Sequence, residues 1–150
     1  MMATFKFDGL QAYEKQLDEL GRAAPAICNL SLYEGAKVLA DAVKAEIPGL
    51  ALPSERQKAG LKAGMGIARF WEKDGTILTK IGFDGYNAVK TKRWPNGQPN
   101  AVIARALIRG TSWLTPDRFT DRAARKARKA AIEAIRKRFD AEILRRTKNM

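Results

Sequence analysis

The amino-acid sequence predicts an α+β fold with two N-terminal helices, a small antiparallel β-sheet and a long basic C-terminal helix. In the first 47 residues, and again after residue 117, apolar side chains recur every three or four positions, as on one face of a helix. Between residues 65 and 83, β-prone residues flank an Asp-Gly pair, as in a hairpin. With 45% hydrophobic and 29% charged residues, the 150-residue chain is expected to form a single domain over residues 1–150.

The N-terminal third predicts two helices with a break between them. Asp8 provides an N-cap for the first helix, and Gly21 ends it. The second helix begins at Pro25, whose fixed φ suits a first helical position, and Pro48 stops it. Gly35 falls inside this second helix. Because glycine has no Cβ, we expect a neighbouring element to approach closely there.

The middle of the chain predicts a linker followed by a hairpin. Residues 49–63 are rich in Pro, Ser, Lys and Gly, a composition typical of a flexible connection. Asp74 and Gly75 then stand between two β-prone runs. An Asp-Gly pair favours the type I′ turn of a two-residue hairpin, since glycine tolerates a positive φ.

A basic loop is predicted over about residues 88–100, where two prolines and an Asn-Gly pair oppose regular structure. Three cations, Lys90, Lys92 and Arg93, stand beside Trp94. Exposed cations next to an aromatic ring are suited to holding nucleic-acid phosphates, so these three residues are candidate DNA-backbone contacts. Trp94 itself is expected to bury its ring and to fasten the loop to the body of the protein.

The last element is predicted to be a helix over about residues 117–146, capped by Thr115 or Asp117. Its alanine-rich first half suits close packing against a neighbour, and its second half carries larger apolar anchors. We expect Phe139 to be one of these anchors; replacing a fully buried Phe with Ala costs about 3–5 kcal/mol. The expected apolar stripe comprises Ala124, Ala127, Ala131, Ile135, Phe139 and Ile143.

The net positive charge is confined to the second half of the chain. Residues 1–84 contain 11 basic and 11 acidic residues, so the whole net charge of +12 lies in residues 85–150. A one-sided positive field attracts polyanions such as nucleic acid or an acidic protein surface. The alternative is that the basic residues only keep one long helix solvated.

Several classes of function are excluded by missing residues. The chain has no histidine and a single cysteine, Cys28, which excludes a zinc site and a Cys–His nucleophile. No glycine-rich phosphate-binding loop is present. We therefore expect no enzymatic activity, no cofactor, no metal and no small-molecule substrate. No membrane-spanning stretch or secretory signal is seen, and the lone cysteine fits a reducing compartment, so synthesis in a cytoplasm is expected.

Three stretches share their order and spacing with a known family. They are Phe7-Asp8-Gly9-Leu10 before a helical pattern, Gly60-Leu61-Lys62 before a strand, and Gly110-Thr111-Ser112 followed by Pro116 and Phe119 before a long charged helix. In this order the chain resembles the small neck and tail-completion proteins at the head–tail junction of long-tailed bacteriophages and prophages. It departs from the family pattern at Arg109, where an acidic–aromatic pair is common, and at Asp117-Arg118, which separates Pro116 from Phe119.

The resemblance implies a virion structural protein, made in the bacterial host cytoplasm, that assembles into a homo-oligomeric ring and joins head to tail. The implied partners are other copies of the chain and neighbouring connector or tail proteins, with non-specific contact to packaged DNA. The candidate subunit or partner interface comprises Arg109, Gly110, Thr111, Ser112, Pro116, Phe119, Arg125, Arg128 and Arg136.

Two other functions remain open from the sequence. The first is a sequence-independent nucleic-acid-binding protein that uses its basic C-terminal part. The second is a protein whose basic helix docks on an acidic partner surface, with Arg125, Arg128 and Arg136 steering association.

Overall fold

Two long helices dominate the computed structural model, which describes residues 10–148. The predicted α+β class is confirmed. The N-cap predicted at Asp8 lies outside the described residues. The elements in chain order are α1 (Leu10–Glu46), a 3₁₀ turn η1 (Ile47–Gly49), α2 (Glu55–Ala63), β1 (Met65–Ile67), β2 (Trp71–Lys73), β3 (Thr76–Leu78), β4 (Ile81–Phe83), α3 (Asn100–Arg109) and α4 (Phe119–Lys148).

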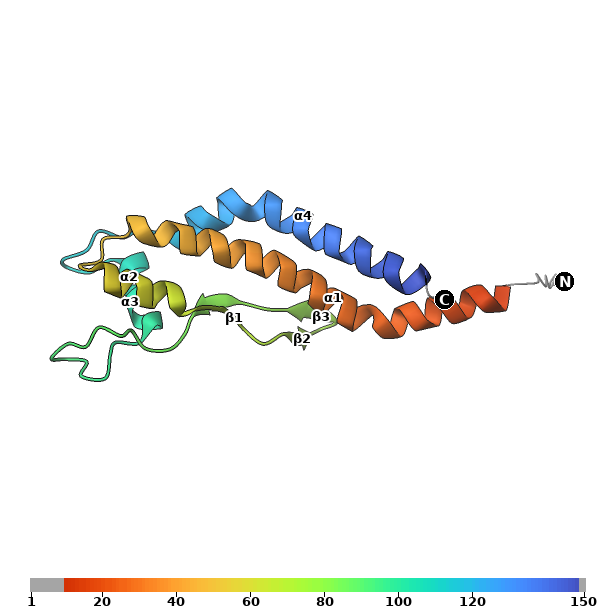
Figure 1. Ribbon diagram of the computed structural model, residues 1–150, viewed down its shortest axis with the longest axis horizontal. Coiled ribbons are helices and arrows are strands. Elements are labelled where there is room, and N and C mark those ends of the chain that lie inside the picture. Colours follow the sequence, from red (N-terminus) through yellow and green to blue (C-terminus); the bar gives the residue numbers. More distant parts are fainter. Residues whose placement is uncertain (1–9, 149–150) are drawn as a thin grey trace.

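The elements form an elongated stack in which α1 is the central layer (Figure 1). Helix α4 runs antiparallel along one side of α1, and the strands lie along the opposite side (Figure 1). Helices α2 and α3 lie at the end away from the N-terminus, and the main hydrophobic core is gathered there (Figure 1). Phe119 anchors α4 in this core, with its ring 6.0 Å from that of Phe83.

The break predicted between two N-terminal helices is wrong, because α1 continues through Pro25 as one helix of 37 residues. Pro25 cannot donate a hydrogen bond to the carbonyl of Gly21. Both residues are exposed, so water can solvate that carbonyl and the cost of the missing bond is reduced. Further along, the fully buried Ile27 and Val43 hold α1 against its neighbours. Tertiary packing therefore overrides the local break signal.

The linker predicted over residues 49–63 is also corrected, since its second part is helix α2. The hydroxyl of Ser54 accepts a hydrogen bond from the backbone N–H of Gln57, which caps the first turn. Leu61 is completely buried in the core and fixes the helix to the body of the protein. Arg56 and Lys62 are exposed on the solvent side of this short helix, whereas Lys58 is mostly covered and donates to the carbonyl of Pro48 at 2.8 Å.

The hairpin predicted at Asp74-Gly75 is confirmed. Both residues have a positive φ, 51° and 76°, as a type I′ turn requires, and Lys73 faces Thr76 across it. The hairpin consists of two short sheets, β2 with β3 and β1 with β4. Between them the N–H of Ala68 donates to the carbonyl of Lys80 at 2.7 Å, which keeps the two arms together.

The predicted C-terminal helix is confirmed to within two residues at each end, but part of its apolar stripe is wrong. Ala127 and Ala131 are buried as expected, whereas Ala123 is buried in place of Ala124. The buried positions repeat every four residues from Phe119, so this anchor sets the face of α4 that meets α1. Phe139 continues this four-residue repeat, but the repeat drifts around a helix of about 3.6 residues per turn, so the side chain has left the face that meets α1 and is 41% exposed. Its truncation should therefore cost less than the roughly 3–5 kcal/mol of a fully buried ring.

The close approach predicted at Gly35 occurs between α1 and α4. A Cβ placed on Gly35 would lie 2.5 Å from Cγ1 of Ile135 and 3.3 Å from the carbonyl oxygen of Ala131. Ala131, which is buried on α4, is also small, so the two backbones pack closely at this point.

We expect Gly35→Ala to lower the free energy of unfolding by about 1–3 kcal/mol, because overpacking at this contact outweighs the gain in helix propensity. Gly21→Ala is the matched control, since a Cβ there meets no atom within 4 Å. The control should raise stability by roughly 0.5–1 kcal/mol. Urea unfolding of both variants measures the difference. Equal stabilisation by both substitutions would contradict the close contact.

Candidate functional site

The cations on the edge of α4 that faces α1 are neutralised by ion pairs. Arg122 contacts the carboxylate of Glu46 at 2.9 Å and that of Asp117 at 3.0 Å. Lys126 reaches the second oxygen of Glu46 at 3.2 Å. Hydrogen bonds from Arg122, and then from Lys126, hold the pKa of Glu46 below its ordinary value. These pairs attach the start of α4 to the end of α1.

A second ion-pair cluster surrounds Glu142, a carboxylate that is only 5% exposed. Arg145 lies 2.7 Å from it, Arg138 lies 3.1 Å away and Arg146 lies 3.7 Å away. The hydrogen bond from Arg145 is the main reason why the pKa of Glu142 is lowered, although burial opposes that shift. Arg138 also contacts Glu34 of α1 at 3.4 Å, so the cluster ties the second half of α4 to α1.

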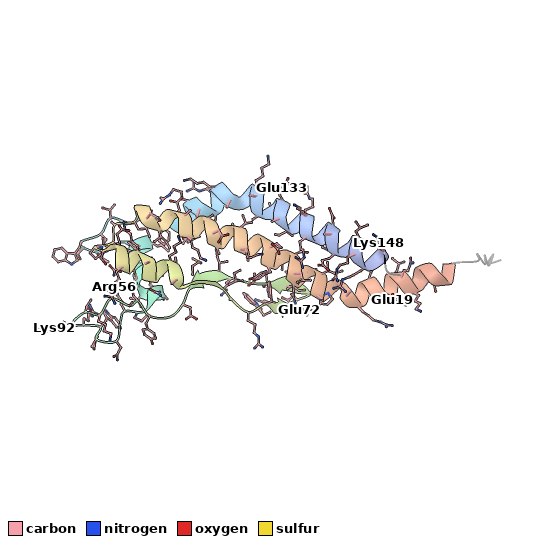
Figure 2. All side chains as sticks on the ribbon, in the orientation of Figure 1. Glu19, Arg56, Glu72, Lys92, Glu133 and Lys148 are labelled. Carbon is pink, nitrogen blue, oxygen red and sulfur yellow. The ribbon has the colours of Figure 1, made fainter. Side chains whose placement is uncertain are left out.

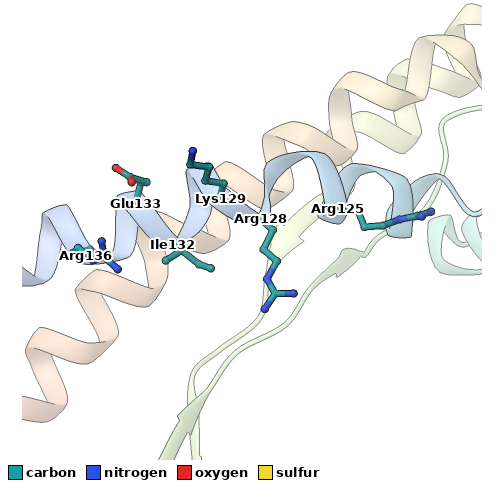
Figure 3. A pocket seen from close by; sticks show the side chains of 6 residues that line it. All are labelled: Arg125, Arg128, Lys129, Ile132, Glu133 and Arg136. Carbon is teal, nitrogen blue, oxygen red and sulfur yellow. The ribbon is translucent and has the colours of Figure 1, made fainter.

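On the outer side of α4 lies an open groove of about 420 Å³ (Figure 3). Three residues predicted as interface, Arg125, Arg128 and Arg136, are brought together there. Within the described part of the chain, none of the groove's four cations makes an ion pair, and Ile132 is 45% exposed among them. The α4 groove is lined by Arg125, Arg128, Lys129, Ile132, Glu133 and Arg136.

This arrangement suits an anionic partner that also offers an apolar side chain. Four cations against one carboxylate give the groove a net positive charge. The sequence pattern did not single out Lys129 and Ile132 as site residues. Lys129 follows Arg125 by four residues, and Ile132 follows Arg128 by four. Because residues four apart share a helix face, this spacing could have placed both residues beside the predicted arginines.

The three predicted DNA-backbone contacts lie together on the loop between β4 and α3. Lys90, Lys92 and Arg93 are all exposed, and Lys92 lies at the end of the molecule away from the N-terminus (Figure 2). Arg93 stacks over Trp94, with its guanidinium carbon 5.9 Å from the ring centroid. Trp94 is half-buried.

Two buried asparagines hold this basic loop in place. The amide of Asn100 donates to the carbonyls of Asp84 at 2.9 Å and Gly60 at 3.3 Å. The amide of Asn87 donates to the carbonyl of Gln57 at 2.9 Å. The loop is thereby fastened to α2, and its cations are presented from a defined backbone.

The predicted Gly-Thr-Ser interface forms a turn between α3 and α4. The hydroxyl of Thr111 accepts hydrogen bonds from the N–H groups of Trp113 at 3.2 Å and Leu114 at 3.1 Å. Trp113 itself is 92% exposed. The sequence pattern did not single out this residue, and no signal around it distinguished an exposed tryptophan from a buried one.

The remaining predicted interface residues separate into surface and core. Arg109, Ser112 and Pro116 are exposed near this turn. Phe119 was expected at the interface, but it is fully buried against Phe83 and belongs to the core. Phe119 is buried because its ring, at the first turn of α4, fixes the position of this long helix against the core.

An apolar hollow of about 270 Å³ lies on α3 beside Phe83. Ala101 and Ile108 contribute apolar surface, and Arg105 and Arg109 stand at its edge. Helix α3, the turn between α3 and α4, and the basic loop all lie toward the same end of the molecule (Figure 1). The α4 groove lies apart from them, along the side of the molecule.

Within the described residues, no three His, Cys, Asp or Glu side chains gather closely enough to hold a metal ion. No helix among residues 10–148 combines the length and the apolar character needed to cross a bilayer. Comparisons of the chain with protein-family models, with curated proteins and with solved structures found no match.

The lowered pKa values of Glu46 and Glu142 predict a loss of stability in acid. Their ionised forms are favoured in the folded chain, so their contribution is present above the unfolded value of 4.5. It is lost as the pH falls below that value and through the lower folded pKa. We expect urea unfolding between about pH 6 and pH 3 to show this loss, with a shallower slope for Glu142→Gln.

The control for this titration is Glu133→Gln, which removes an exposed carboxylate from the same helix. Glu133 makes no ion pair with any described residue, so the variant should keep the wild-type slope. Identical slopes for the wild type and both variants would show that the Glu142 cluster does not stabilise the fold.

Proposed function

We propose that this chain is a structural subunit that assembles with copies of itself into a ring at the head–tail junction of a long-tailed bacteriophage. The observation that carries the proposal is Trp113, held 92% exposed on the hydrogen-bonded turn after α3. A large aromatic side chain kept in water by a defined turn is suited to insertion into a partner.

Further exposed apolar side chains support an assembling subunit. Leu17, Tyr86 and Leu144 are each at least two-thirds exposed, and they lie on different elements of the elongated molecule. Tryptophan, tyrosine and arginine are the residues that most often dominate binding energy at protein interfaces. The apolar hollow on α3 has two such arginines, Arg105 and Arg109, in its lining.

The order of elements agrees with what the resemblance implies for a neck or tail-completion protein. The Gly-Thr-Ser stretch forms the turn that carries Trp113, and the long charged helix follows it. A subunit whose complementary surfaces lie at different places makes head-to-tail contacts, which close into a ring when the rotation between copies fits. The proposed partners are therefore other copies and the adjoining connector or tail proteins.

Sedimentation velocity over a concentration series tests this proposal. We expect wild-type protein to form a discrete larger species and Trp113→Ser to shift its formation to at least tenfold higher concentration, since a hot-spot residue is worth about 2 kcal/mol or more. Because the side chain is exposed, the variant should unfold like the wild type, within about 0.5 kcal/mol.

Ser112→Ala, next to Trp113 on the same turn, is the matched control and should assemble normally. If Trp113→Ser assembles as readily as this control, Trp113 is not an interface residue. A wild-type chain that stays monomeric, both alone and when mixed with connector or tail proteins, would refute the proposed assembly.

Sequence-independent DNA binding is a second candidate function, favoured by the basic loop. Lys90, Lys92 and Arg93 are exposed on an anchored loop, and none makes an ion pair within the described residues. Such a loop can neutralise phosphates without reading bases. It complements the ring proposal, since DNA passes through a head–tail junction.

Replacing all three cations with serine should weaken binding to unrelated duplexes and reduce the salt slope by about 0.9 for each phosphate that is no longer neutralised. The control replaces Lys15, Arg22 and Lys73, which are exposed cations outside the loop. Fluorescence anisotropy at several salt concentrations measures both effects. Equal weakening by the two triple variants would show that net charge, and not this loop, governs binding.

A further inference from the structure

The α4 groove has the spacing of a seam for another helix. Arg125, Lys129, Ile132, Arg136 and Phe139 follow one another at alternating intervals of four and three along α4. This interval keeps side chains on one helix face, as in the packing seam of a coiled coil. Ile132 and Phe139 are both more than 40% exposed, so the seam offers apolar contacts as well as charge.

The N-terminal part of α1 carries a complementary face. Its end projects beyond the C-terminal end of α4 (Figure 1). Glu14, Leu17, Asp18 and Gly21 are exposed and, at intervals of three and four, share one side of the helix. We call these four residues the α1 end. Gln16, Glu19, Leu20 and Ala23, on the opposite side, are half-buried.

We propose that the α1 end of one copy docks into the α4 groove of a second copy. Leu17, which is 67% exposed, would pack on Ile132, while the carboxylates of Glu14 and Asp18 would meet the groove's cations. Each surface thus places one apolar side chain among charges of one predominant sign, and the two signs are opposite. This inference rests on the self-assembly proposed above and names a contact that would produce it.

Gly21, the small residue of the α1 end, permits a partner helix to approach α1 closely. A Cβ placed on Gly21 would meet no atom within 4 Å, so the surface of this glycine is free to receive a partner. The same helix already uses Gly35 in this way, where Ile135 and Ala131 of α4 approach it closely. Lys15 and Arg22 lie on an adjacent side of α1, outside the docking face.

The contact requires two copies. Within one chain, α1 is a continuous helix whose N-terminal end points away from the groove (Figure 1). Because the α1 end and the α4 groove are different surfaces, each docked pair of copies leaves one α1 end and one α4 groove free. The contact therefore propagates head to tail and ends only when a ring closes.

A protein helix suits the α4 groove better than a nucleic-acid backbone. Phosphates need only cations, whereas the groove has Ile132 at its centre and the carboxylate of Glu133 at its edge (Figure 3). A carboxylate repels phosphate, while an exposed isoleucine gains by burial against another apolar side chain. Binding of DNA is therefore assigned to the basic loop and not to this groove.

Charge reversal on each surface tests the contact with the full-length chain. Glu14→Lys with Asp18→Lys reverses the α1 end, and Arg128→Glu with Arg136→Glu reverses the groove. Each double variant alone should need at least tenfold more protein to assemble than the wild type. Mixed in equal amounts, the two should assemble again, because each reversed surface then finds a complementary one.

Lys62→Glu with Lys73→Glu is the matched control, since both lysines are exposed and outside the two surfaces. It should assemble like the wild type. Circular dichroism confirms that each variant is folded, and recovery on mixing excludes misfolding as the cause of any loss.

The outcomes separate this contact from the proposed function. If the wild type assembles and the reversals have no effect, or if mixing does not restore assembly, the contact is refuted while self-assembly stands. If the wild type forms no larger species at any concentration, either alone or mixed with connector or tail proteins, the contact and self-assembly are both refuted. If Arg128→Glu with Arg136→Glu weakens only DNA binding, the groove binds nucleic acid and the inference is overturned.

Discussion

The close packing of α1 against α4 is the constraint on which the rest of the structure depends. Gly35 on one helix and Ala131 on the other leave no room for larger side chains, so the backbones approach closely. Such a seam buries little apolar area per residue, and the larger apolar side chains are gathered instead around α2 and α3. The result is an elongated, two-helix frame whose outer surfaces remain free to contact other molecules.

The same packing separates the cations of α4 into two groups, one that faces α1 and one on the outer face of the helix. Toward α1, Arg122, Arg138 and their neighbours are paired with Glu46, Glu34 and Glu142, and they strengthen the frame. On the outer face the cations of the α4 groove have no partner among the described residues. The four cations of the groove are exposed, so their charge can guide association. The ion pairs that stabilise the frame and the cations that we propose to meet a partner thus lie on different sides of one helix.

Sequence patterns predicted the features set by local chemistry. The Asp74-Gly75 turn, the close approach at Gly35 and the extent of the C-terminal helix each follow from the residues involved. Features decided by tertiary packing were not predictable in this way: α1 continues through Pro25, and α4 is rotated so that Phe139 is partly exposed. The groove arginines were selected as candidate interface residues from their charge alone. The exposure of Trp113 was not predicted, because composition does not indicate which tryptophan stays in water.

Hydrogen exchange followed by mass spectrometry at low and high protein concentration can separate the stable two-helix frame from the surfaces through which it assembles. We expect the amides of the α1–α4 seam to be protected at both concentrations, because the frame is stable within one chain. Protection at the Trp113 turn, in the α1 end and along the α4 groove should increase only at high concentration. Exchange that does not depend on concentration anywhere, or a seam protected only at high concentration, would contradict a stable frame that assembles through its outer surfaces.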